Sequence, residues 1–389
     1  MYPSEAQEQQ MLSHCAHARF VWNLAVDQQS NYRVTRGSAP NHVARNRQLT
    51  EARANSEWLR SGSQTVQQQA LRDFDQAQRN FFNRPNHFKP PTFRKRHLNE
   101  GFRIVAVKPE HVRKINRRWS EVKVPKIGWV RFRRTRAVPE AKSYRVTLDR
   151  AGRWHIAFAV VPDPIPAPGG GEVAGVDRGV VHAAALHDGS TYDYSRPDLD
   201  VRVKRLQRRL ARAKKGSNRR AKVRSQLGRA QAKRADARKD FIEKTTTDIA
   251  RSFDLIRLEN LNTKSMTTSS KGTIEEPGAN VAQKAGLNRA ILDKAWGLFA
   301  QRLEHKAKGR VEYVPAAYTS QRCSACQKPH ERSRKSQAVF LCIFCGFSAN
   351  ADVNAAINIA AGHAVTAQGG SPLGQPTNCE PQTNPLRVA

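Results

Sequence analysis

The sequence predicts a multidomain α+β protein: a helical domain, a small β-barrel, and then an α/β domain that contains an inserted metal ribbon. Three observations predict this order. Apolar residues recur at helical spacing over residues 11–82, and short β-rich segments bounded by Gly or Pro occupy residues 102–161. After a Pro- and Gly-rich linker at 162–171, strand patterns alternate with helix patterns. A chain of 389 residues is long enough for about two or three such domains.

Charge and cysteine content narrow the class of protein. The formal net charge is +34, whereas a soluble small domain typically carries a net charge of about 2 to 8 in magnitude. The excess favours a polyanionic partner, and because no run of 18 or more apolar residues occurs, a membrane is not expected. Four of the six cysteines form two Cys-x-x-Cys pairs, while Cys15 and Cys379 are isolated and interpreted as incidental. This usage indicates metal binding in a reducing cytoplasm, not a disulfide framework.

The first 166 residues contain the expected helical domain and barrel. Two helices, separated by a polar linker, carry apolar faces made of Leu12, Cys15, Ala18, Trp22 and Val26, and of Val66, Ala70, Phe74 and Phe81. Strand segments follow at 102–107, 121–132 and 143–161. Basic residues alternate here with five aromatic residues, Phe93, Trp119, Trp129, Phe132 and Trp154. These rings could stack on nucleic acid bases, but a role in the barrel core is favoured for most of them.

After the linker, residues 171–189 are typical of a β-hairpin whose first strand is buried. Asp177 lies within this apolar strand and is followed by Arg178. A buried carboxylate is costly unless it has a partner. A salt bridge to Arg178 is one interpretation, but neighbouring residues on a strand point to opposite faces. A metal ligand is therefore the preferred interpretation of Asp177.

Residues 200–251 predict two very basic helices joined by a turn at 216–218. Their apolar faces are narrow, and the other faces carry Arg and Lys with few acids. Charges of nearly one sign repel one another unless phosphates neutralise them. The expected nucleic-acid contacts are Arg205, Arg208, Arg209, Arg212, Lys214, Lys215, Arg219 and Arg220, together with Arg322 beside the first cysteine pair.

The remaining elements are a buried strand at 253–262, an amphipathic helix at 287–310, a strand at 310–315 and a last helix at 352–365. This order matches an RNase H-like fold, a mixed sheet flanked by helices. Asp177, Glu259 and Asp352 fall at strand ends or at a helix start, and only the fold could bring them together. Carboxylates select hard cations, so two Mg²⁺ (or Mn²⁺) ions are expected, acting in phosphodiester hydrolysis.

The two cysteine pairs are the most specific local signal. Cys323 and Cys326 are separated from Cys342 and Cys345 by fifteen intervening residues, a spacing typical of a zinc ribbon with four thiolate ligands. Such a zinc ion is structural, because four thiolates leave no open position for a substrate. Two chance pairs of free thiols are the alternative. Nearby basic residues indicate that the ribbon touches nucleic acid.

Several segments together resemble the TnpB family, the transposon-encoded OrfB proteins similar to ancestors of compact type V CRISPR effectors. They are GVDRGV, LENLN, YTSQRCSAC, CIFCG and ADVNAAINIA. The resemblance implies a helical recognition domain at 1–83, a wedge-like β-barrel at 84–166 and a RuvC-like nuclease domain. That domain comprises 172–317 and a last helix at 348–365, with the zinc ribbon inserted at 318–347. Residues 366–389 have the composition of a disordered tail.

The resemblance implies an RNA-guided DNA endonuclease with Asp177, Glu259 and Asp352 as catalytic acids. Its partners would be a guide RNA from the transposon end and double-stranded target DNA beside a short flanking motif. The protein would be located in the cytoplasm of a prokaryote and would associate with the nucleoid when bound to DNA. A catalytically silent RNA-guided repressor and a DNA transposase remain alternatives. Two departures stand out. The sequence starts at the YP-x-x-x-Q segment, which a basic strand usually precedes, so that strand is missing or the start site is misplaced. Ala351 stands where many relatives carry Arg.

Overall fold

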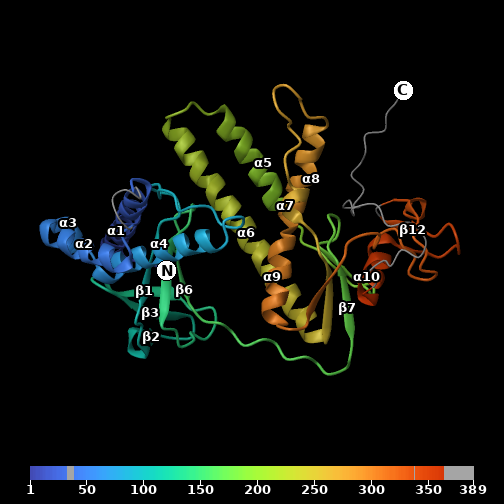
Figure 1. Ribbon diagram of the computed structural model, residues 1–389, viewed down its shortest axis with the longest axis horizontal. Helices are drawn as coiled ribbons and strands as arrows, with labels where there is room; N and C mark the ends of the chain where they lie inside the picture. The colour runs from blue at the N-terminus through green and yellow to red at the C-terminus, as the bar shows by residue number, and fades with distance from the viewer. Residues whose placement is uncertain (33–38, 337, 363–389) are drawn as a thin grey trace. The chain divides into compact units, whose positions relative to one another are not determined.

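The structure is a computed structural model that describes residues 1–32, 39–336 and 338–362 (Figure 1). The chain forms two compact units. The first contains residues 1–162 and 209–232, and the second contains residues 163–208 and the described residues from 233 onward. No described helix is long and apolar enough to cross a membrane. The predicted tail at 366–389, Cys379 and residues 363–365 of the predicted last helix lie outside the described residues.

Four helices open the first unit: α1 (Glu5–Ser30), α2 (His42–Asn55), α3 (Glu57–Ser61) and α4 (Gln64–Asn83). The predicted apolar faces of α1 and α4 are confirmed, since Cys15, Val66 and Phe74 are each at most 1 % exposed in one core. The polar linker predicted between them is wrong in part, because it contains α2 and α3. Leu49 of α2 and Leu59 of α3 are buried in the same core, so both helices pack against it.

Six strands complete that core as two three-stranded antiparallel sheets, in the orders β1-β5-β6 and β2-β3-β4. They are β1 (Gly101–Val105), β2 (Val112–Lys114), β3 (Trp119–Val124), β4 (Gly128–Arg133), β5 (Ser143–Leu148) and β6 (Trp154–Phe158), with a 3-10 turn at Pro109–His111 before β2. The three predicted strand segments are confirmed, and β2 is additional. A core role is confirmed for Phe132 and Trp154, whereas Phe93 is 54 % exposed.

The second unit is built on a mixed five-stranded sheet in the order β11-β10-β7-β8-β9. Strands β7 (Val173–Asp177), β10 (Leu255–Glu259) and β11 (Val311–Val314) are parallel. Strand β8 (Ala184–Leu186) is antiparallel to β7, and β9 (Thr191–Tyr192) is antiparallel to β8. The hairpin predicted at 171–189 is confirmed as β7 and β8. Ala174, Val176, Ile256 and Leu258 form one apolar face of the sheet, which packs on α6 and α9.

Six helices surround or extend from this sheet: α5 (Pro197–Arg212), α6 (Asn218–Ser252), α7 (Thr263–Met266), α8 (Val281–Lys294), α9 (Trp296–Lys306) and α10 (Ala351–Ala361). The basic helix pair is confirmed as α5 and α6. The single helix predicted at 287–310 is wrong, because Ala295 adopts a left-handed conformation (φ 53°) and separates α8 from α9. The break turns Trp296, 4 % exposed, into the interior, where its Nε1 donates to the Gly179 carbonyl at 3.2 Å.

Candidate functional site

Strand parity places two of the three predicted acids on one face of the sheet. Alternate residues of a strand face opposite sides, and Val176 and Leu258 belong to the apolar core on the α6 and α9 side. Asp177 and Glu259 directly follow these residues, so both face the other side. Because Val176 pairs with Leu258 in the parallel register, the two acids occupy equivalent positions at the same ends of β7 and β10.

Helix α10 covers this second face and carries the third acid. It lies beside β7 (Figure 1), and it approaches Gly175 closely, because a Cβ added there would be 2.0 Å from the Ala356 carbonyl oxygen. From this contact, Asp177 lies two residues along the strand and Asp352 one helical turn back, each about 6 Å away. An added Cβ on Gly179 would lie 3.7 Å from Asp352 Oδ2. The fold therefore directs all three acids to one end of the sheet.

The three acids belong to the same end of the sheet, but their carboxylates do not form a closed cluster. Within residues 1–32, 39–336 and 338–362, the one group of three or more metal-ligating side chains whose ligand atoms all lie within 4.8 Å is the four cysteines. Three carboxylates at closer range would repel one another without cations between them. Their oxygen donors suit a hard divalent cation, and such a cation would draw them together.

Two basic side chains partly offset the negative charge of the acids at this end of the sheet. Arg178 is 5 % exposed, and its guanidinium donates to the backbone carbonyls of Glu259 and, at 3.4 Å, Trp296. Burial lowers the pKa of Arg178, and Glu259 and Asp177 oppose that shift. Arg334 Nη2 lies 3.6 Å from Asp352 Oδ1. Burial nevertheless raises the pKa of Asp352, although Arg334 and His182 act in the opposite direction.

The second predicted metal site has the geometry of a zinc ribbon. Cys323 Sγ lies 3.7 Å from Cys345 Sγ, and Cys326 Sγ lies 3.6 Å from Cys342 Sγ. A tetrahedral zinc ion with Zn–S bonds of about 2.3 Å requires sulfur atoms about 3.8 Å apart, so the four thiols fit the ion. Short strands β12 (Val339–Leu341) and β13 (Ser348–Asn350) and a 3-10 turn at Glu331–Ser333 frame the ribbon. Cys15, by contrast, is buried in the first unit's core.

The predicted nucleic-acid contacts have different environments. Seven of them are exposed along α5, the turn and the start of α6: Arg205, Arg208, Arg209, Arg212, Lys214, Lys215 and Arg219. Arg220 is half-buried and donates to the carbonyl of Ala213 at 2.9 Å and to that of Leu210, so it caps the end of α5. Arg322 is also half-buried, between Cys323 and the turn that precedes the ribbon.

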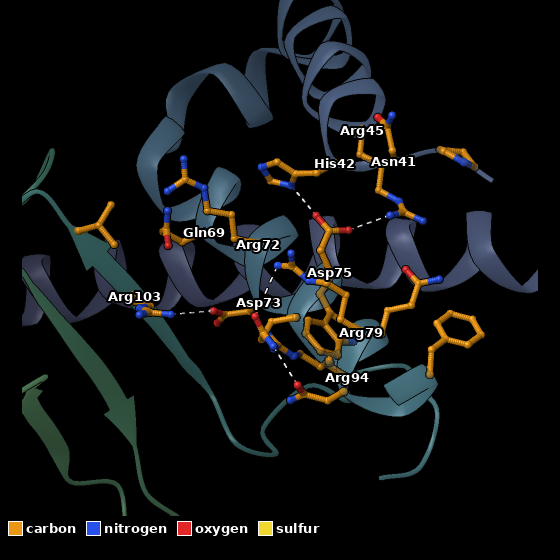
Figure 2. A pocket seen from close by; sticks show the side chains of 18 of the residues that line it. Asn41, His42, Arg45, Gln69, Arg72, Asp73, Asp75, Arg79, Arg94 and Arg103 are labelled. Atoms are coloured by element: carbon orange, nitrogen blue, oxygen red, sulfur yellow. Dashed lines mark hydrogen bonds and ion pairs between the residues drawn. The ribbon is translucent and has the colours of Figure 1, made fainter. Parts of the chain in front are cut away.

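The first unit contains a basic pocket that the sequence pattern did not predict. It has a volume of about 940 Å³ and is lined mainly by α2, α4, β1, β5 and the segment around Arg94 (Figure 2). Asp75 pairs with Arg45 at 2.8 Å, and Asp73 with Arg103 at 3.2 Å (Figure 2). Arg94 stacks 3.6 Å above the Trp22 ring, and burial lowers its pKa to about 10. The helical spacing of apolar residues in α4 predicted only the face of that helix that packs in the core. The pocket lies along the polar face of the same helix, which the spacing does not describe.

Three family models match parts of the chain. They are described as a helix-turn-helix domain (residues 1–38), a probable transposase of the OrfB IS605 type (155–270) and a Cas12f1-like TNB domain (296–359). The last matched range contains the four cysteines and Asp352. The range matched by the helix-turn-helix model contains one long helix, α1, over Glu5–Ser30.

Two relatives are similar to this chain over most of its length. A protein of Escherichia coli K12 named as an RNA-guided DNA endonuclease, InsQ, is 35 % identical over 96 % of this chain and 94 % of its own length. A Streptomyces pristinaespiralis protein named likewise is 27 % identical over 95 % and 89 %. The solved structure of a Cas12f1 complex with guide RNA and target DNA has a TM-score of 0.51 at 15 % identity, covering 91 % of this chain and 82 % of that chain, which shows a shared fold. The chain belongs to the TnpB family of transposon-encoded OrfB proteins.

Proposed function

We propose that this protein is an RNA-guided DNA endonuclease that cleaves target DNA beside a short flanking motif. The proposal rests on the equivalent positions of Asp177 and Glu259 at the ends of β7 and β10, and on Asp352 in the helix that packs beside β7. The relatives named as RNA-guided DNA endonucleases support the same activity. The guide RNA would derive from the transposon end, as the family resemblance implies.

The three acids would hold two Mg²⁺ or Mn²⁺ ions, which when bound supply an activated water and stabilise the leaving oxygen of the phosphodiester. The protein's own groups prepare this site. Strands β7 and β10 fix the backbone of two acids in register, and α10 delivers the third. Arg178 holds the end of β10 and the start of α9 together beneath them. Gly179 keeps the space beside the Asp352 carboxylate free of a side chain.

Other parts of the chain would bind nucleic acid. The exposed Arg and Lys residues of α5 and α6 would contact phosphates of the RNA or DNA. The basic pocket beside α4 would take part in reading the flanking duplex, since it exposes guanidinium and amide groups from Arg72, Gln76 and Arg79 at helical spacing. One zinc ion on the four cysteines would stabilise the ribbon.

The substitution Asp177→Asn tests the catalytic proposal. It keeps the size of the side chain while removing the charge that holds a cation, so cleavage of plasmid DNA with Mg²⁺ should fall by at least about 10³-fold. Binding of guide RNA and of target DNA should remain within about threefold of the wild type. Asp188→Asn, in the exposed turn between β8 and β9, is the matched control and should cleave normally.

Persistent cleavage by the Asp177→Asn variant would contradict the assignment of the acids. Wild-type protein that binds its guide and target but never cleaves would instead favour the silent repressor. Joining of DNA strands by the purified protein alone would favour the transposase.

A further inference from the structure

A chain of hydrogen bonds connects Glu259 to the zinc ribbon through a side chain outside the proposed acid triad. The segment after β11 turns back toward the end of β10, where Tyr318 adopts a left-handed conformation (φ 64°). The carbonyl of Tyr318 accepts from the backbone N–H groups of Gln321 and Arg322. This turn places Thr319 against Glu259, and both side chains are 6 % exposed.

The Thr319 hydroxyl donates to the Glu259 carboxylate at Oε1. The carbonyl of Ala316, 3.1 Å away, is a second acceptor for the same proton. A hydroxyl has one proton to donate, and a hydrogen bond to an ionised carboxylate is stronger than one to a neutral carbonyl. The ionised form of Glu259 therefore favours its own contact with Thr319, which fixes the orientation of that carboxylate.

Thr319 is in turn held by α10. Asn358 is 3 % exposed, and its Nδ2 donates to the carbonyls of Thr319 at 2.9 Å and Arg322 at 2.8 Å. One turn earlier, Asn354 donates to the Arg322 carbonyl at 2.8 Å and accepts from the Ser324 N–H at 2.9 Å. The two amides thus fasten both sides of Cys323 to the helix that carries Asp352.

We propose that Thr319 is a positioning residue that orients Glu259 toward the divalent cation. The amides of α10 fix Thr319 in the same structure that holds the ribbon. This inference rests on the proposed function, because it requires a cation at the three acids. Groups that hydrogen-bond to metal-binding carboxylates typically change metal affinity by about 10–100-fold when removed.

Binding of Mn²⁺ to the full-length, zinc-loaded protein tests the inference, measured by electron paramagnetic resonance without DNA. Thr319→Val keeps the shape and removes the donor, so the Mn²⁺ dissociation constant should rise by about 10–100-fold. Thr319→Ser restores the hydroxyl and should bind Mn²⁺ within about threefold of wild type. Zinc content should stay at one ion per chain in both variants, which shows an intact ribbon.

Thr246→Val is the matched control. Thr246 is also buried, and its hydroxyl donates to the Ile242 carbonyl at 2.6 Å within α6. It should lower stability without changing Mn²⁺ affinity. Unchanged affinity in Thr319→Val, or equal losses in Thr319→Ser or Thr246→Val, would overturn the positioning role while leaving the proposed function intact. Wild-type protein that binds no Mn²⁺ would overturn the proposed metal site and the inference with it.

Discussion

Gly175 controls how closely α10 approaches the sheet, and Gly175→Ala is the sharpest test of the site geometry. An added Cβ would lie 2.0 Å from the Ala356 carbonyl oxygen, 2.4 Å from the Ala360 nitrogen and 2.8 Å from the Ala360 Cβ. Two of these three atoms are helix backbone, so no side-chain rotation relieves the overlap. The helix must move away from β7 by roughly 1.4 Å to bring the Ala356 oxygen to an ordinary contact distance, because packed interiors have no spare volume.

This movement would carry Asp352 away from Asp177 and Glu259. A displacement of about 1 Å in an active site can lower the rate by about 10²-fold, and overpacking costs about 1–3 kcal/mol in stability. We therefore expect Gly175→Ala to reduce cleavage of guided plasmid DNA by about 10²-fold. Cleavage kinetics at saturating Mg²⁺ and thermal denaturation measure the two effects separately.

Gly297→Ala is the matched control, because an added Cβ on Gly297 in α9 meets no atom within 4 Å. Alanine is favoured over glycine within a helix by about 0.5–1 kcal/mol, so this variant should be at least as stable as wild type and fully active. Gly175→Ala protein that cleaves within about threefold of wild type would refute the placement of α10 and Asp352.

Three further predictions address the metal, the pH dependence and the charge. Cys345→Ser should lose zinc, measured by atomic absorption, and make residues 318–347 sensitive to protease, because the ribbon folds on its metal; an undigested ribbon would contradict this. Burial raises the pKa of Asp352 in the folded protein above its value in the unfolded chain. The free energy of unfolding therefore falls as pH rises from the ordinary Asp value to the raised pKa, and it stays lower at higher pH. Asp352→Asn should therefore raise the melting temperature at pH 7 without added divalent cations, a difference that should shrink as pH falls toward the ordinary Asp value. Replacing Arg208 and Arg212 by Ala should reduce the slope of log affinity against log salt by about 0.7–0.9 for each phosphate that these side chains neutralise in the wild type, and an unchanged slope would remove these residues from the interface.

Much of the chain follows from local pattern. Short β-rich segments predicted β1 and β3 to β6, apolar runs predicted the buried strands β7 and β10, and helical spacing predicted α1 and α4. The Cys-x-x-Cys spacing predicted the thiol cluster that the structure forms. These predictions succeed because side-chain periodicity and ligand spacing are properties of a short segment.

The errors lie where packing overrode local preference. The helix broken at Ala295 consists mostly of good helix-forming residues, and the break accompanies the burial of Trp296 beside Gly179. The segment treated as a polar linker forms α2 and α3 because Leu49 and Leu59 reach the core. The basic pocket was missed since its residues come from separate elements.

The sequence by itself determined the chemistry available: three carboxylates at element ends, four thiols at ligand spacing and a large excess of cationic side chains. Only the tertiary structure decided that Asp177 and Glu259 share a face in register, and that α10 reaches that face at Gly175. It also decided that Thr319, sixty residues beyond Glu259, donates to its carboxylate. The reason is physical: residue type and spacing set what each segment can do, whereas contacts between distant segments exist only once the core is packed.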